Sequence, residues 1–465
     1  MKNTKRYLTN GYCISNNTRE TGLNNNDLIC GATGSGKTRG YVIPNIKLSQ
    51  ESMIICDTKG VLYGELAKEL RSRGYRVMNL DLVGDESECG YNPFLYIRRN
   101  QKTGLYREDD IHKLANAICP MEDAEQPFWE NAAKMFLEAL IAYTLEAFPR
   151  EYHNFDTVRR LAVQLGDCDP NEGSLVDKQC RIGVRGAYLR KFDYACNTYT
   201  EDKEPVYLLS KEEICQGAGR QAVFRYGFAS MIMELEARKP DSIAAKLYNM
   251  FKSCTRAEKM YASIMGILAE KLNPLISNEL IAVYKNPKQI SFEEFGRRKT
   301  ALFLTVSDTD RTKDMLANVM YTQALDCLIR SADRDYKEHR LPVPVRFILD
   351  DFAASAIIPD FDNIISVIRS REIAVSIIVQ SISQLRDKYG EQKSATILNN
   401  CDHIIYLGGQ DIATAEYISK RANKTLASII EQPITATYLL ERGSKAIYLQ
   451  GQNNSTMKGG MSYGI

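Results

Sequence analysis

Residues 31–38 read GATGSGKT and fit the pattern G-x-x-x-x-G-K-[ST] between a strand-like and a helix-like segment. Glycines at these places let backbone N–H groups close around phosphate oxygens, and a following helix adds the partial positive charge of its N-terminus. Lys37 suits the β- and γ-phosphates of a nucleotide, and the Thr38 hydroxyl suits Mg²⁺. The alternative to a phosphate-binding role is that these glycines only form a turn between a strand and a helix. The pattern predicts a phosphate loop whose cofactors are ATP and Mg²⁺, although such a loop reads phosphates and not the base.

The second chemical feature is a pair of adjacent aspartates, Asp350 and Asp351, which follow the apolar run VRFIL. A phosphate-loop protein needs an acid at the end of a second strand, and we expect that strand to lie beside the phosphate-loop strand. Asp350 would complete the Mg²⁺ shell with Thr38, and Asp351 would polarise the attacking water. Asp351 could instead cap the next helix.

Short apolar runs without alternation recur along the chain, as expected of parallel strands that are buried on both faces. Helical patterns lie between most of them, for instance at 60–74 and 312–338. This alternation predicts an α/β fold with a mainly parallel central sheet. The expected strands lie at 26–31, 52–57, 76–81, 300–306, 345–350, 374–380, 402–408 and 445–451.

The strand signal stops after residue 97, and helical patterns dominate from about 105 to 290. We therefore predict an all-α domain at 105–290, with a loop-rich stretch at 166–204, inserted between two parts of one nucleotide-binding domain. The first part, 1–104, carries the phosphate loop, and the second, 291–465, carries the aspartate pair.

The bulk composition excludes several classes of protein. A formal net charge of +2 excludes a globally basic nucleic-acid binder, but it does not exclude local basic patches on the surface. Twelve cysteines occur without a C-x-x-C pair, and four histidines show no zinc-ligand spacing, which favours reduced structural thiols. The N-terminus has no signal-peptide pattern, and no apolar run is long enough to span a membrane.

The chain resembles the type IV coupling proteins, the TraG-type ATPases that link conjugative DNA to a secretion channel. The resemblance extends over most of the chain, including QPFWENAAKMFLEAL in the expected insertion. Its main segments are GATGSGKTRGYVIPNI at 31–46, DTKGVLYGE at 57–65, GYNPF at 90–94, LPVPVRFILDDFA at 341–353 with IPDFDNIISVIRSREI at 358–373, and VQSISQL at 379–385 with NNCDHIIYLGG at 399–409.

This resemblance implies a RecA-like, FtsK/HerA-like P-loop motor that hydrolyses ATP and assembles as a homo-hexamer around a channel. The implied partners are relaxase-bound single-stranded DNA and the components of a type IV secretion channel. The implied location is the cytoplasm, at the inner face of the bacterial cytoplasmic membrane.

The resemblance also implies roles for single residues. Gln380 matches a glutamine that contacts the γ-phosphate or water, and Arg369 or Arg371 matches an arginine that reaches a neighbouring subunit's nucleotide. Both arginines could instead pair with nearby acids on a solvated face. Asp57 is expected near the nucleotide, and Lys59 either joins it or is a surface lysine. The residues expected to contact the nucleotide are Gly31, Ala32, Thr33, Gly34, Ser35, Gly36, Lys37, Thr38, Arg39 and Asp57.

The chain departs from the family pattern in three places. The phosphate loop begins at residue 31, so we expect no N-terminal membrane helix and membrane association only through partners. Asp351 stands where many members have Glu, and no acidic C-terminal tail is visible. Two alternatives to a conjugation motor stay open: a soluble hexameric translocase or helicase, and a weakly active docking platform for relaxase or protein cargo.

Overall fold

The computed structural model describes residues 4–84, 87–120, 127–166, 182–185, 188–193, 198–205, 228–254, 258–307, 309–352, 357–433 and 435–450. The chain divides into two compact units. One is formed by Met1–Cys89 together with Lys288–Ile465, and the other by Gly90–Pro287.

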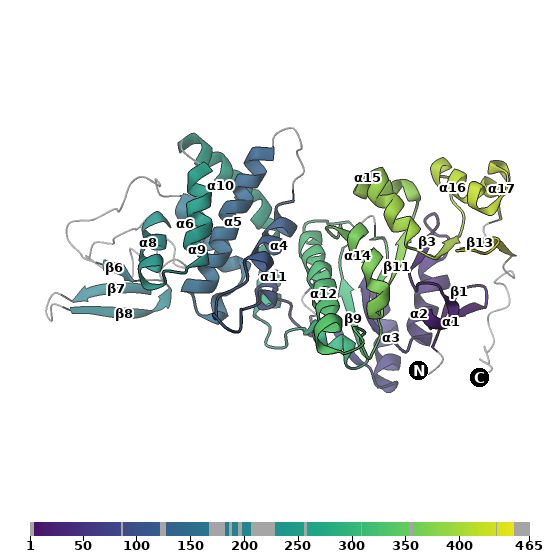
Figure 1. The fold of residues 1–465 in the computed structure, drawn as a ribbon, viewed down its shortest axis with the longest axis horizontal. Coiled ribbons are helices and arrows are strands. Elements are labelled where there is room, and N and C mark those ends of the chain that lie inside the picture. The colour runs from purple at the N-terminus through teal and green to yellow at the C-terminus, as the bar shows by residue number, and fades with distance from the viewer. Residues whose placement is uncertain are drawn as a thin grey trace. The chain divides into compact units, whose positions relative to one another are not determined.

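The first unit is built on a nine-stranded sheet in the order β14-β13-β12-β3-β11-β10-β4-β9-β5. Strands β3, β9, β11 and β13 of this sheet are labelled in Figure 1. The strands from β12 to β5 are parallel, and β13 and β14 are antiparallel to their neighbours. The predicted α/β fold with a mainly parallel sheet is therefore confirmed. The strands are β3 (Asp27–Cys30), β4 (Ser52–Asp57), β5 (Arg76–Asp81), β9 (Thr300–Thr305), β10 (Val345–Leu349), β11 (Ile373–Val379), β12 (His403–Tyr406), β13 (Ala436–Glu441) and β14 (Ile447–Gln450).

The strand that carries Asp350 does not lie beside the phosphate-loop strand, and that expectation was wrong. Strand β11 lies between β3 and β10 and pairs in parallel with both. The sequence order of strands does not determine their spatial order, because a crossover helix can place the next strand on either side of the strand that it follows. The inserted strand places Gln380 between the phosphate loop and Asp350.

Helices cover both faces of this sheet. Helices α2 (Ile43–Leu48) and α3 (Val61–Ser72) share one buried apolar cluster with the sheet, to which Ile348 of β10 belongs. Successive strand residues point to opposite faces, so Phe347 points to the other side. There it packs on Tyr321 of α12 (Asp314–Asp335), with ring centroids 6.5 Å apart. The remaining elements of this unit are β1 (Lys5–Thr9), β2 (Tyr12–Ser15), α1 (Thr18–Thr21), η1 (Thr38–Val42), η6 (Phe292–Gly296), α14 (Phe361–Val367), η7 (Ile368–Arg371), α15 (Ile382–Asn399), α16 (Ile412–Ala422) and α17 (Leu426–Ile430).

The second unit is mainly helical, but it is not all-α as predicted. Its helices are α4 (Glu108–Ile118), α5 (Pro127–Ala147), α6 (Phe155–Gly166), α8 (Phe228–Arg238), α9 (Ile243–Cys254), α10 (Glu258–Leu272) and α11 (Asn278–Lys285), with short turns η2 (Pro93–Tyr96), η3 (Arg150–Tyr152) and η5 (Asn273–Leu275). The segment expected to be loop-rich instead contains the antiparallel sheet β6 (Ile182–Arg185), β7 (Tyr188–Asp193) and β8 (Thr198–Pro205). Its strands are rich in charged residues, so they lack the unbroken apolar runs that indicate buried parallel strands.

The second unit begins at Gly90, whereas the predicted insertion begins at 105. The reason is local packing of the GYNPF segment on the helices of this unit. The Phe94 ring lies edge-on to Phe155 at 5.1 Å, and Asn92 Nδ2 donates to the His153 carbonyl at 2.8 Å. Within the described residues, no helix combines the length and apolar character needed to cross a membrane.

Candidate nucleotide-binding site

The phosphate loop follows β3 at the carboxyl edge of the sheet, between the ends of β11 and β12. Gly31 N donates to the Val379 carbonyl at 3.2 Å, and Ala32 N donates to the Gly408 carbonyl at 2.9 Å. The loop is thus held to both neighbouring strands. In open parallel sheets this edge is where ligands bind.

Glycine is required at several points of the loop. Gly34 has φ +79° and Gly36 has φ +84°, values that residues with a Cβ rarely adopt. A Cβ on Gly31 would stand 2.6 Å from Ser35 Oγ and 2.9 Å from Leu407 Cβ. Ser35 Oγ itself is buried, and the described residues give it no hydrogen-bond partner. A buried hydroxyl of this kind, in a loop that requires glycine at several points, is consistent with a loop that binds an anionic ligand.

The Lys37 ammonium lies within the loop. Its Nζ donates to the carbonyls of Gly31 at 2.7 Å and Ala32 at 3.1 Å, and the residue is buried. Thr38 opens a π-helical turn, η1, on which Arg39 is exposed. Such turns are uncommon and occur frequently at functional sites.

Thr38 and Asp350 meet at the loop, although 312 positions separate them in the chain. Thr38 Oγ1 donates to Asp350 Oδ2 at 2.9 Å, and Asp350 Oδ1 accepts from Asp351 N at 3.1 Å. Burial raises the pKa of Asp350, against the hydrogen bond from Thr38, which lowers it. One hydroxyl and one carboxylate fit Mg²⁺, which keeps several waters and takes further oxygens from phosphates. Accordingly, no cluster of three metal-ligating side chains occurs among the described residues.

Asp351 is partly buried and has φ +49°, in the left-handed region. A residue with a Cβ is strained in this conformation, and such strain concentrates at functional sites. The alternative role, capping of the helix expected over FAAS, concerns residues 352–355, most of which lie outside the described residues.

Gln380 follows β11 directly, and Asp57 ends β4. Gln380 is partly buried, and its backbone N donates to Gln384 Oε1 at 3.2 Å. Asp57 Oδ2 accepts from Tyr63 N at 2.9 Å, and burial raises the pKa of Asp57. The carboxylate of Asp57 thereby holds the start of α3 at the same edge of the sheet, while Lys59 is exposed.

Arg369 and Arg371 lie at the opposite edge, because η7 precedes β11 and Gln380 follows it. Arg371 makes two 2.9 Å contacts with the carboxylate of Asp333, an acid that the sequence did not suggest. Arg369 is exposed, and its Nη2 donates to the Gly22 carbonyl at 2.9 Å. The structure therefore gives Arg371 a structural ion pair and leaves Arg369 with a backbone partner.

Sequence reasoning missed the role of Gly408 and Gly409, which follow β12 beside the phosphate loop. Gly408 has φ +90°, and a Cβ on Gly409 would lie 3.7 Å from Ala32 N. The signal was present as LGGQ at 407–410, two glycines directly after an apolar strand.

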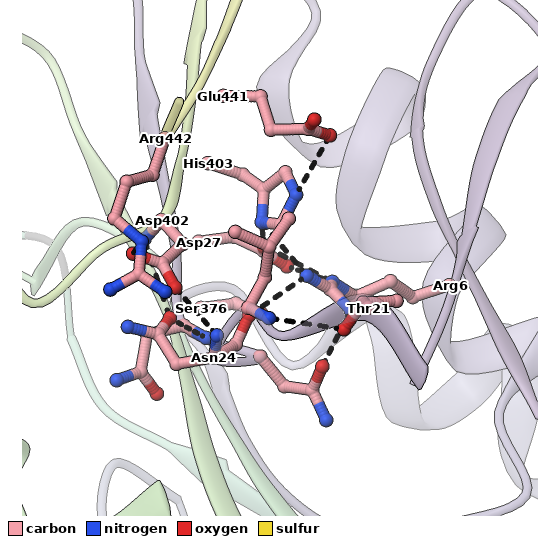
Figure 2. A network of polar contacts seen from close by, with 12 residues as sticks. Arg6, Thr21, Asn24, Asp27, Ser376, Asp402, His403, Glu441 and Arg442 are labelled. Atoms are coloured by element: carbon pink, nitrogen blue, oxygen red, sulfur yellow. Dashed lines mark hydrogen bonds and ion pairs between the residues drawn. The ribbon is translucent and has the colours of Figure 1, made fainter. Parts of the chain in front are cut away.

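A buried charged network also escaped the sequence analysis (Figure 2). Asp27, at the start of β3, contacts Arg6 Nε at 3.0 Å and accepts from Tyr41 Oη of η1 at 2.6 Å. Arg346 of β10 lies 3.5 Å from the same carboxylate, and His403 Nδ1 of β12 lies 3.4 Å from it. The network thus fixes the strands that carry the phosphate loop, Asp350 and Gly408.

Together these features define a P-loop NTPase fold. A phosphate loop follows one strand, an acid that accepts a hydrogen bond from Thr38 follows a second, and a polar residue follows the strand between them. The family model described as "Type IV secretory system Conjugative DNA transfer" matches residues 4–181 and 219–429, and the chain belongs to this family.

Curated relatives and solved structures agree with this assignment. VirD4 of Rhizobium radiobacter and VirD4 of Agrobacterium fabrum are each 22% identical over 396 residues, which is 84% of this chain and 47% and 48% of theirs. The chain thus spans about half the length of the curated relatives it matches.

Two structures of the plasmid coupling protein TrwB are similar to this one. The unbound TrwBdeltaN70 has a TM-score of 0.61 at 15% identity, with 97% of this chain and 89% of that chain covered. TrwB in complex with ADP and Mg²⁺ has a TM-score of 0.58 at 15% identity, with 92% and 85% covered. This likeness confirms the predicted RecA-like fold.

Proposed function

We propose that this chain is the motor part of a type IV coupling protein, an Mg²⁺-dependent ATPase. The observation that carries this is the 2.9 Å hydrogen bond between Thr38 and Asp350 next to the buried Lys37 ammonium. Lys37 would neutralise phosphate charge, and Thr38 with Asp350 would hold the metal ion. Bound Mg²⁺ supplies charge stabilisation to the transferring phosphoryl group.

The solved complexes support the choice of cofactor. TrwB has been seen with ADP and Mg²⁺ and with an ATP analogue, and its fold is that of this chain. Gln380 would contact the γ-phosphate or the attacking water from its place between the loop and Asp350. Asp57 would lie near the nucleotide, where its carboxylate holds the start of α3 in place.

The work proposed for this ATPase is the transfer of relaxase-bound single-stranded DNA into a type IV secretion channel. The family description, conjugative DNA transfer, supports this. A homo-hexamer at the inner face of the cytoplasmic membrane is the proposed setting. If DNA is held by its phosphates, its affinity should fall steeply with salt, and a flat salt response would contradict the DNA part of the proposal.

The first test is steady-state ATP hydrolysis with Mg²⁺, with and without single-stranded DNA, by the wild type and by Lys37→Ala. We expect turnover in the wild type and a loss of about 100-fold or more in the variant, because the ammonium neutralises charge in the transition state. Turnover that is no higher than in the variant would overturn the motor and favour the docking platform.

A second test concerns Asp351. We expect Asp351→Asn to slow hydrolysis by about 10- to 100-fold, because an amide is a poor acceptor for the proton of the attacking water. Binding of a fluorescent ATP analogue should be kept, since Asp350 and Thr38 are untouched. Asp335→Ala serves as the control, because this half-exposed aspartate pairs with Arg297 on the surface. Unchanged turnover in Asp351→Asn would show that the carboxylate has no part in hydrolysis.

A further inference from the structure

Tyr41 lies on the π-helical turn η1 and joins this turn to two neighbouring strands of the sheet. Ile43 N closes the turn by donating to the Thr38 carbonyl five residues earlier, so the turn contains one residue more than a turn of α-helix. Tyr41 is buried, with 1% of its surface exposed. Its hydroxyl lies 2.6 Å from Asp27 Oδ2 on β3 and 2.8 Å from Ser376 Oγ on β11. One hydroxyl thus connects the turn that begins at Thr38 with both strands.

The direction of these hydrogen bonds follows from the charges around them. Burial and the nearby Asp27 carboxylate raise the pKa of Tyr41 well above its ordinary value, so the phenol keeps its proton. Burial would raise the pKa of Asp27 too, but Arg6 and other cations outweigh it, so Asp27 is an ionised acceptor. Tyr41 therefore donates to Asp27, and Ser376 donates to Tyr41 Oη. Ser376 Oγ in turn accepts from Arg346 Nη1 at 3.2 Å, which leaves no hydroxyl proton of this series unused.

The turn that Tyr41 holds is also the turn that directs Thr38 toward Asp350. Thr38 opens η1, and its Oγ1 donates to Asp350 Oδ2 at 2.9 Å. If η1 tightened to an α turn, Thr38 and Tyr41 would rotate relative to each other about the helix axis, because an α turn contains one residue fewer. Tyr41 cannot rotate without losing a short, charge-assisted hydrogen bond between two buried groups, and such a loss is costly. The bond to Asp27 therefore opposes a change that would move the Thr38 hydroxyl away from Asp350.

We propose that Tyr41 is a positioning residue for the metal ion: its hydroxyl, held by Asp27 and Ser376, keeps η1 in the π conformation in which Thr38 faces Asp350. The inference rests on the proposed ATPase function and adds a residue that acts through Thr38. Removing a group that orients a metal ligand commonly lowers metal affinity or activity by about 10- to 100-fold. The expected defect is therefore in Mg²⁺ affinity and not in the binding of phosphates by the loop.

The test is Tyr41→Phe, which removes the hydroxyl and keeps the ring. Asp27 retains Arg6 and Arg346 as partners, so the variant should fold. Binding of a fluorescent ATP analogue is titrated with Mg²⁺, and the affinity of the analogue is measured separately without metal. We expect the Mg²⁺ concentration at half-maximal effect to rise by about 10-fold, while the metal-free affinity stays unchanged. Turnover should fall at low Mg²⁺ and recover at high Mg²⁺.

Tyr75→Phe is the matched control. Tyr75 belongs to the same buried apolar cluster as Tyr41, and its hydroxyl lies 2.9 Å from the Ser49 carbonyl and 3.0 Å from the Glu51 carbonyl. Both variants should lower the thermal midpoint, because each loses buried hydrogen bonds, but only Tyr41→Phe should weaken Mg²⁺ binding.

Two outcomes would overturn the inference: an Mg²⁺ affinity of Tyr41→Phe equal to that of the wild type, or an equal loss of Mg²⁺ affinity in Tyr41→Phe and Tyr75→Phe. A wild type whose nucleotide binding and turnover do not respond to Mg²⁺ would overturn the proposed function itself, and the inference with it.

Discussion

Asp350→Ala is expected to lower Mg²⁺-dependent ATP hydrolysis by about 1,000-fold, which corresponds to the several kcal/mol that a bound metal ion contributes to phosphoryl transfer. Its carboxylate is the one that the structure places against Thr38, and the waters around Mg²⁺ cannot replace a charged ligand. The measurement is a steady-state assay over a range of Mg²⁺ concentrations.

Nucleotide binding distinguishes a lost metal ligand from a collapsed site. A fluorescent ATP analogue should still bind Asp350→Ala in the absence of Mg²⁺, because the phosphate loop and Lys37 are unchanged. Asp350→Asn is the matched variant, since its amide oxygen can still accept from Thr38 Oγ1 but carries no charge. We expect it to be nearly as inactive as the alanine variant. Full activity would show that the charge of Asp350 is not needed to bind the metal ion.

Asp27→Ala is expected to destabilise the fold by about 3–5 kcal/mol, the range measured when one partner of a buried ion pair is removed. Burial alone would raise the pKa of Asp27, but Arg6, His403 and Arg346 outweigh it, and the pKa lies well below its ordinary value. Asp27 is fully buried, and Arg6 is 2% exposed, so the substitution leaves a buried cation without its carboxylate. Urea unfolding at pH 7 measures the loss.

The stabilisation that Asp27 contributes should decrease as the pH falls. Because the pKa of Asp27 is lowered by folding, its contribution is fully present above the unfolded-state value of about 4 and is lost as the pH falls. The gap between Asp27→Asn and the wild type should therefore shrink under acid conditions. Glu69→Ala, which breaks an exposed pair with Lys47, should change stability by less than about 1 kcal/mol. If Asp27→Ala and Glu69→Ala lowered the free energy of unfolding equally, the buried network would contribute no more to stability than an exposed ion pair.

The sequence by itself determined the α/β class, the glycine loop at 31–38 and the acid, Asp350, that lies against it. These follow from local rules, because the glycine spacing of residues 31–38 and the unbroken apolar runs have few alternative structures. The same rules missed β6, β7 and β8, whose charged residues do not produce a buried run, and they placed the start of the second unit at 105 because the packing of Phe94 on Phe155 is not visible in the chain order.

Only the tertiary structure decided which residues meet. The order of parallel strands depends on where each crossover returns, so the placement of β11 between β3 and β10 could not be read from the chain. The buried contacts of Asp27 with Arg346 and of Tyr41 with Ser376 join segments hundreds of residues apart. Side chains such as these carry no periodic signal, because their pairing is set by charge and distance in the folded state and not by spacing along the sequence.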